Sequence, residues 1–224
     1  MSLGNYFTIR NMKLVKTLKV FCGVVLLSGM ISCRHSVGIA CSEMQPTTDT
    51  PLVSRTVYVD DRFTSTEMKW IRESTDQWKT ATGNRVEYRI QVVNKNTMIP
   101  LDKSSEYSCP DTSVTGQVTY LWKASATDPI VVKLEAERNK NDGSRVAGFA
   151  NGACDSDITW IYMVINFAKG EEKFKNTLVH EIGHTLGLGH VDIAYGSVMY
   201  PTIDSSSKCI TEIDIDNFCN EWDC

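Results

Sequence analysis

The chain has 224 residues, of which 42% are hydrophobic and 22% are charged. It is long enough for one ordinary globular domain with a core, and two full domains would be cramped. Its formal net charge is −4, and the charge becomes more negative once residues 1–32, which are basic, are set aside. Such an acidic chain is a poor partner for nucleic acid or for an anionic lipid surface.

Residues 1–32 have the order of an export signal. Basic side chains come first, no acidic side chain is present, and an apolar run follows over residues 20–31. This run is too short to cross a membrane, which takes about 20 residues. We therefore expect a signal peptide over residues 1–32, starting at Met1 or at the more ordinary Met12.

The end of the apolar run, Met30-Ile-Ser-Cys33, resembles the lipobox of bacterial lipoproteins. Cys33 would then be lipidated, and it would anchor the protein at the outer membrane or cell surface. The alternative is ordinary cleavage nearby and secretion, with Cys33 a plain thiol or half of a disulfide. Residues 33–52 are rich in Ser, Thr and Pro, and we expect them to form a tether or a short pro-segment.

Residues 53–224 are expected to form one α+β domain. Alternating patterns predict strands at 55–60 and 86–93, and a Thr64-x-x-Glu67 capping box predicts the start of a helix that Gly83 ends. Further β-prone runs predict strands at 118–122, 130–134 and 158–165. Apolar residues that recur every four positions predict a helix over about 172–186.

Three histidines at the end of that last helix form the pattern H-E-x-x-H-x-x-G-x-x-H. His180 and His184 are one helical turn apart, so both imidazoles project from the same side and can share one metal ion. Gly187 stands where the helix must stop, and it can turn the chain so that His190 returns to the same ion. Three imidazoles leave one coordination position open, as in catalytic rather than structural zinc sites.

Glu181 follows the first predicted ligand directly, so its carboxylate should lie beside the ion rather than on it. It can take a proton from a zinc-activated water and later pass that proton to a leaving amine. The sequence therefore predicts peptide-bond hydrolysis with Glu181 as general base and acid.

The histidine pattern, followed by Ser197-Val-Met-Tyr-Pro201, is similar to the signature and Met-turn of the metzincin zinc metalloproteases. Met199 matches the methionine that lies beneath the zinc in that family as an apolar floor. Pro201 most resembles the matrixins, so the chain is similar to a bacterial matrixin-like catalytic domain. The resemblance implies a mixed twisted sheet, an active-site helix, a Met-turn, a C-terminal helix near 210–218, and one catalytic zinc.

The resemblance also implies a protein or peptide substrate bound as an extended strand along the edge of the sheet. We expect that edge at residues 158–166, and we expect a monomer. Two other functions stay open. One is a non-catalytic surface lipoprotein that uses a metzincin scaffold for binding, and the other is a metzincin outside the matrixins.

Other metals have weaker support. Animal matrixins hold a second, structural zinc partly through histidines upstream of the signature, and His35 is the one such histidine here, so we expect that site to be absent or replaced. Asp155 and Asp157 are candidate calcium ligands, although acidic residues in loops are more often simply solvated.

The cysteines predict disulfides in an exported chain. Leaving aside Cys22 in the signal and Cys33, six remain, which allows up to three disulfides, and the spacing does not decide the pairing. Cys41 would either belong to a structural disulfide or block the zinc as a thiolate. For the last three of the six, a disulfide that staples the C-terminal tail is the plainer role. The six cysteines, in chain order, are Cys41, Cys109, Cys154, Cys209, Cys219 and Cys224.

Overall fold

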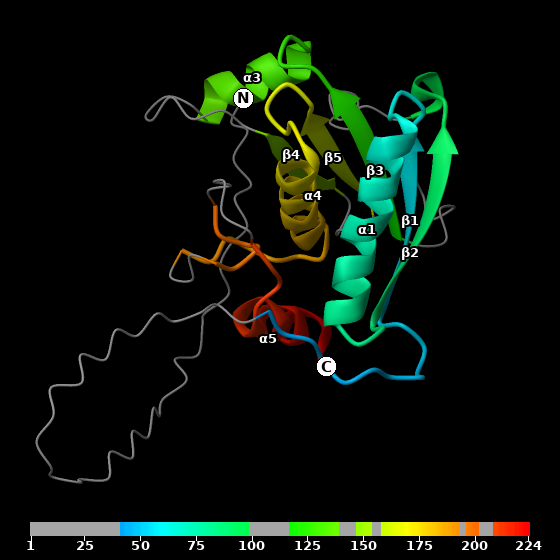
Figure 1. Cartoon of the computed structure of the whole chain (residues 1–224), viewed down its shortest axis with the longest axis vertical. Coiled ribbons are helices and arrows are strands. Elements are labelled where there is room, and N and C mark those ends of the chain that lie inside the picture. Colours follow the sequence, from blue (N-terminus) through cyan, green and yellow to red (C-terminus); the bar gives the residue numbers. More distant parts are fainter. Residues whose placement is uncertain (1–40, 99–116, 139–146, 154–157, 193–195, 202–207) are drawn as a thin grey trace, which may run out of the picture. The chain divides into compact units, whose positions relative to one another are not determined.

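In the part of the chain that the computed structural model describes, five strands form one mixed sheet, in the order β2-β1-β3-β5-β4 (Figure 1). The strands are β1 (Val53–Asp60), β2 (Val86–Val93), β3 (Gln117–Ala124), β4 (Gly148–Ala153) and β5 (Ile158–Val164). Neighbouring strands are parallel except for β4, which runs antiparallel to β5. The helices are α1 (Ser65–Ala81), α3 (Pro129–Arg138), α4 (Glu171–Thr185) and α5 (Glu212–Trp222), with a short 3-10 helix, η1 (Lys95–Thr97).

The structure describes residues 41–98, 117–138, 147–153, 158–192, 196–201 and 208–224, all within the compact unit Gly38–Cys224. Within these ranges no helix combines the length and the apolar character that crossing a membrane requires. Some predicted features lie outside the described residues: the signal peptide 1–32, Cys33, His35, the first part of the expected tether, Cys109, Cys154, Asp155 and Asp157.

Helices α1 and α4 pack side by side on one face of the sheet (Figure 1). Because side chains alternate along a strand, every second residue of the central strands points toward these helices. Val57 of β1 and Ile161 of β5 are buried in one core with Trp78 of α1 and Leu178 of α4. The Trp78 indole N–H also donates a hydrogen bond to the Val179 carbonyl at 2.8 Å, which fixes α1 against the middle of α4.

The predicted start of α1 is confirmed. The Thr64 hydroxyl accepts the Glu67 backbone N–H, and the Glu67 carboxylate accepts the Thr64 backbone N–H at 2.7 Å, which completes a capping box. The Glu67 carboxylate also pairs with the ammonium of Lys123 on β3 at 2.7 Å. The cap therefore ties the start of α1 to the sheet.

The predicted strand at 130–134 is wrong, because these residues belong to helix α3. The run Ile130-Val-Val favours a strand locally, but Pro129 suits the first turn of a helix, where a missing N–H costs nothing. Val131 is buried against Trp160 and Tyr162, on the face of the sheet that points away from α4. Tertiary packing of one helical face therefore outweighs β propensity.

The predicted sheet edge at 158–166 is also wrong. β5 is an inner strand, paired with β3 on one side and β4 on the other, so β4 is the edge on this side among the described strands. The sequence of β4, Gly148-Phe-Ala-Asn-Gly-Ala153, has weak β propensity, and its alignment with β5 is a long-range contact that local pattern does not reveal.

The N-terminal arm, residues 41–52, is attached to the domain. Cys41 forms a disulfide with Cys209, and the Ser42 backbone N–H donates to the Ile210 carbonyl at 3.0 Å. A cysteine held in this bond has no thiolate to offer, so the structure contradicts the zinc-blocking role considered for Cys41. The predicted stapling of the C-terminal tail is confirmed for Cys219 and Cys224, which form a second disulfide, whereas Cys209, the third cysteine of that prediction, bonds the N-terminal arm instead.

Candidate metal centre

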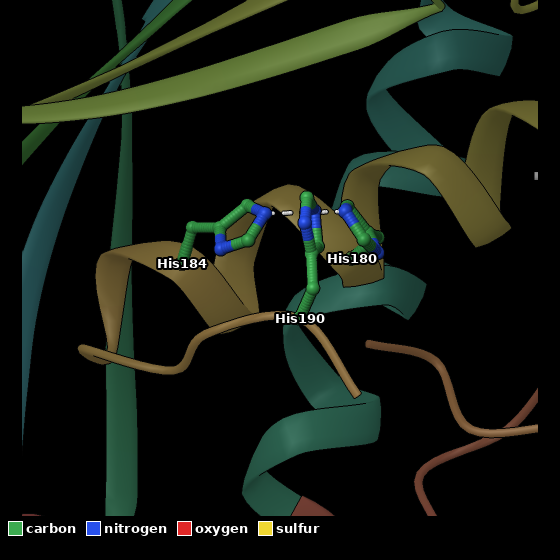
Figure 2. A group of neighbouring side chains, drawn as sticks. All are labelled: His180, His184 and His190. Carbon is green, nitrogen blue, oxygen red and sulfur yellow. Dashed lines mark hydrogen bonds between the residues drawn. The ribbon is translucent and has the colours of Figure 1, made fainter. Parts of the chain in front are cut away.

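The three predicted metal ligands come together beside helix α4. His180 and His184 extend from the helix and His190 from the chain that follows it, and Figure 2 shows the three rings turned toward one another. One ligand atom from each histidine lies within 4.8 Å of the other two. His180 is buried and His190 is exposed, so the cluster has an inner end in the core and an outer end that faces solvent.

Each of the two helical histidines is oriented by a backbone carbonyl. The His180 Nδ1 lies 2.7 Å from the Val198 carbonyl oxygen, and the His184 Nδ1 lies 2.8 Å from the Leu188 carbonyl oxygen. A carbonyl can only accept, so both Nδ1 atoms carry the proton and donate. This arrangement leaves both Nε2 atoms with an unshared electron pair, the form in which histidine binds a metal.

The spacing of these nitrogen atoms fits one zinc ion. The two Nε2 atoms are 3.2 Å apart, and two imidazole ligands of a tetrahedral zinc are separated by about 3.4 Å. Burial and then the neighbouring His184 lower the pKa of His180 to about 3, so its ring is neutral near pH 7. Two neutral rings with facing electron pairs repel one another, and a shared cation removes that repulsion.

Glu181 is buried beside the predicted ligands, against the start of β4. The residue is 4% exposed. A β-carbon built on Gly148, the first residue of β4, would lie 3.0 Å from the Glu181 Cγ. The carboxylate therefore lies between α4 and the start of β4.

Gly187 produces the predicted turn after α4. Its φ of 86° is in the left-handed region, which a residue with a side chain adopts at a cost. The Leu188 backbone N–H then donates back to the Gly183 carbonyl at 3.1 Å, so the chain reverses within one turn of the helix end. This reversal is what brings His190 back to the two helical histidines.

The Met-turn supports the histidines from below. Met199 is fully buried, and a β-carbon on Gly183 of α4 would collide with its sulfur, so the sulfur packs directly under the helix between the two helical histidines. The Met199 carbonyl accepts the Val191 backbone N–H at 2.9 Å, next to His190. The preceding residue, Val198, supplies the carbonyl that orients His180. One short segment thus contacts both ends of the cluster.

Asp214 fixes the Met-turn, a role that the sequence pattern does not reveal. Its fully buried carboxylate accepts the Ser197 hydroxyl at 2.5 Å and the backbone N–H and hydroxyl of Thr211 at 2.8 Å. The Ser197 oxygen in turn accepts the Met199 backbone N–H at 2.9 Å. The spacing Thr211-x-x-Asp214 signals a capped helix, but nothing local in the sequence pairs that cap with Ser197.

Comparisons with known proteins identify the family of this chain. The structure of archaemetzincin from Methanopyrus kandleri matches with a TM-score of 0.47 and 15% identity, over 80% of this chain and 100% of that chain. Among curated proteins, none matches this sequence. The family model described as Matrixin matches residues 65–219, which is more than half of the chain and includes all three histidines. The chain therefore belongs to the matrixin family, zinc metallopeptidases of the metzincin type.

Proposed function

We propose that this protein is a zinc-dependent endopeptidase in which His180, His184 and His190 hold the metal and Glu181 moves the protons. The observation that carries the proposal is the convergence of three imidazoles within 4.8 Å, with a buried carboxylate on the residue that follows the first of them. Because His190 is exposed while His180 is buried, a substrate can reach the cluster from the solvent side.

Zinc, when bound, supplies a Lewis acid that acidifies water and polarises the scissile carbonyl. Glu181 takes the proton of the attacking water and passes it to the nitrogen of the leaving amine, so the peptide bond breaks with protons in balance. The carbonyls of Val198 and Leu188 hold the two helical imidazoles in one tautomer throughout. Met199 packs under the same helix and keeps that side of the centre dry.

The substrate binds as an extended strand along β4. This strand pairs with β5 on one side, and no described strand pairs with its other side, so its backbone groups there can bond to a peptide. Gly148 brings the start of β4 against Glu181, which supports a path that leads a bound strand past the carboxylate. The expected substrate is therefore a protein segment without regular structure. The proposed enzyme acts as a monomer.

The proposed enzyme works outside the cytoplasm. The signal-like residues 1–32 support export, and the two disulfides suit an oxidising compartment. Lipidation of Cys33 would hold the enzyme at the bacterial membrane surface. Mass spectrometry of the purified mature protein would detect the lipid on Cys33, and an unmodified chain cleaved elsewhere would favour secretion instead.

The first prediction concerns Glu181. We expect Glu181→Gln in the full-length protein to keep its zinc and to cleave an unfolded protein about 10²–10⁴-fold more slowly, because proton transfer is lost while the ligands stay. Glu172→Gln is the matched control, since Glu172 lies on the same helix with an exposed side chain. Zinc content and initial cleavage rates are measured for all three proteins.

Two outcomes would contradict the proposal in different ways. A parent protein that binds one zinc but cleaves nothing in a broad peptide library would favour the non-catalytic binding scaffold. A Glu181→Gln variant as fast as the parent would leave the peptidase activity intact and remove Glu181 from its mechanism.

A further inference from the structure

The indole of Trp222 is bonded to the end of the metal-binding helix. Trp222 is the last residue of α5, and its N–H donates to the Leu186 carbonyl at 2.9 Å. Leu186 is the C-cap of α4, and the last carbonyls of a helix have no partner inside the helix. The Trp222 side chain therefore satisfies one of these carbonyls from a distant part of the chain.

The turn that Trp222 holds controls two of the three histidines. Residues 186–188 contain the left-handed Gly187, and the Leu188 carbonyl accepts the His184 Nδ1–H at 2.8 Å. His190 follows two residues later, so its direction of approach is set by the same turn. A shift of Leu186 would consequently displace the acceptor of His184 and the backbone that carries His190.

The Cys219–Cys224 disulfide encloses Trp222 in a small loop. The two cysteines are five residues apart, and Asp223 between them adopts a left-handed conformation with φ of 53°. The Phe218 ring packs 6.5 Å from the Trp222 ring, on the core side of α5. The side chain of Glu221 lies against Gly187, 3.1 Å from where a β-carbon would be. The loop thus contacts the turn at two adjacent residues.

We propose that Trp222 is a positioning residue of the metal centre, and that the Cys219–Cys224 disulfide holds its indole against the Leu186 carbonyl. This role rests on the proposed function in one respect, namely that the three histidines bind zinc. In this proposal the C-terminal loop holds the turn that orients His184 and His190.

The test compares Trp222→Phe with the parent in the full-length protein. Phenylalanine keeps an aromatic ring and removes the N–H donor. We expect zinc affinity, measured by competition with a chelator, to fall about 10-fold, as for the loss of other groups that orient metal ligands. We also expect the visible absorption bands of the Co²⁺-substituted protein to change, and kcat to fall more than KM rises.

Trp122→Phe is the matched control. The Trp122 indole N–H is buried and has no acceptor among the described residues, and its ring stacks on Tyr162 at 5.9 Å, on the face of the sheet away from α4. The same change of side chain there removes ring area but no hydrogen bond. We expect its zinc affinity and its Co²⁺ spectrum to match those of the parent.

A Trp222→Phe variant with the zinc affinity and Co²⁺ spectrum of the parent would overturn the proposal. If that variant does not fold, Cys219→Ser with Cys224→Ser decides, because it keeps the indole and opens the loop. Weaker zinc binding with an altered Co²⁺ spectrum supports the proposal, and parent-like values overturn it. A parent that binds no zinc would overturn the proposed function itself, so the two failures are distinguishable.

Discussion

Gly187 shows how much one residue contributes to the metal centre. In Gly187→Ala the alanine must adopt a left-handed backbone conformation, and its β-carbon lies 3.1 Å from the Glu221 side chain. We expect a loss of about 1–2 kcal/mol in the free energy of unfolding, measured by urea titration, together with weaker zinc binding. Gly189→Ala is the control, because a β-carbon there meets nothing within 4 Å. Equal stability of the two variants would contradict a required left-handed turn.

Glu67 gives a prediction about pH. Burial by itself raises the pKa of Glu67, but the Lys123 ammonium and the hydrogen bonds from Thr64 outweigh it and hold the pKa below its usual range. A carboxyl whose pKa is lower in the folded state stabilises the fold above its unfolded pKa, and this contribution is lost as the pH falls through the folded pKa.

The measurement compares the parent with Glu67→Gln by urea unfolding at a series of pH values. We expect the parent's advantage to be largest near pH 7 and to shrink below pH of about 4.3, the ordinary value for glutamate. Glu43→Gln is the control, since the Glu43 side chain is exposed. An advantage that does not change with pH would assign the effect of Glu67 to packing rather than to charge.

Among the elements, those defined by local signals are the ones that sequence reasoning predicts well. The four-residue apolar period of α4, the Thr64–Glu67 cap of α1 and the glycine after α4 act within a few residues, so their spacing is enough. Helix α3 and strand β4 depend on distant partners. Val131 becomes helical where it can bury against Trp160, and the glycine-rich β4 becomes a strand where β5 offers a pairing edge.

The same distinction applies to the metal centre. The proposed ligands and the proposed general base follow from the spacing of four side chains on one helix and one turn. The groups that orient them do not, because the Val198 and Leu188 carbonyls are backbone atoms that any residue supplies. Trp222 lies 36 residues after the carbonyl it binds, a distance at which a sequence pattern carries no signal.

For the molecule as a whole, the two disulfides should contribute unequally to stability. Cys41–Cys209 joins residues 168 apart, whereas Cys219–Cys224 joins residues five apart. Because the entropy of closing a loop in the unfolded chain grows with its length, removing the first should cost roughly 3 kcal/mol more than removing the second. Paired Cys→Ala variants, compared by urea unfolding, check this difference. A larger loss from the C-terminal pair would contradict the chain-entropy explanation.

The Cys41–Cys209 bond also has a mechanical consequence. Tension applied to the chain that precedes Cys41 is transmitted to Cys209 through the disulfide. The force therefore does not have to pass through the N-terminal arm, and it does not separate β1 from the sheet. The backbone of Cys209 forms a β-bridge with Ser197 in the Met-turn, and the Val198 N–H donates a hydrogen bond to the Cys209 carbonyl at 3.0 Å. Val198 in turn holds His180. Tension on the upstream chain would therefore act on the floor of the metal centre before it reached the core of the sheet.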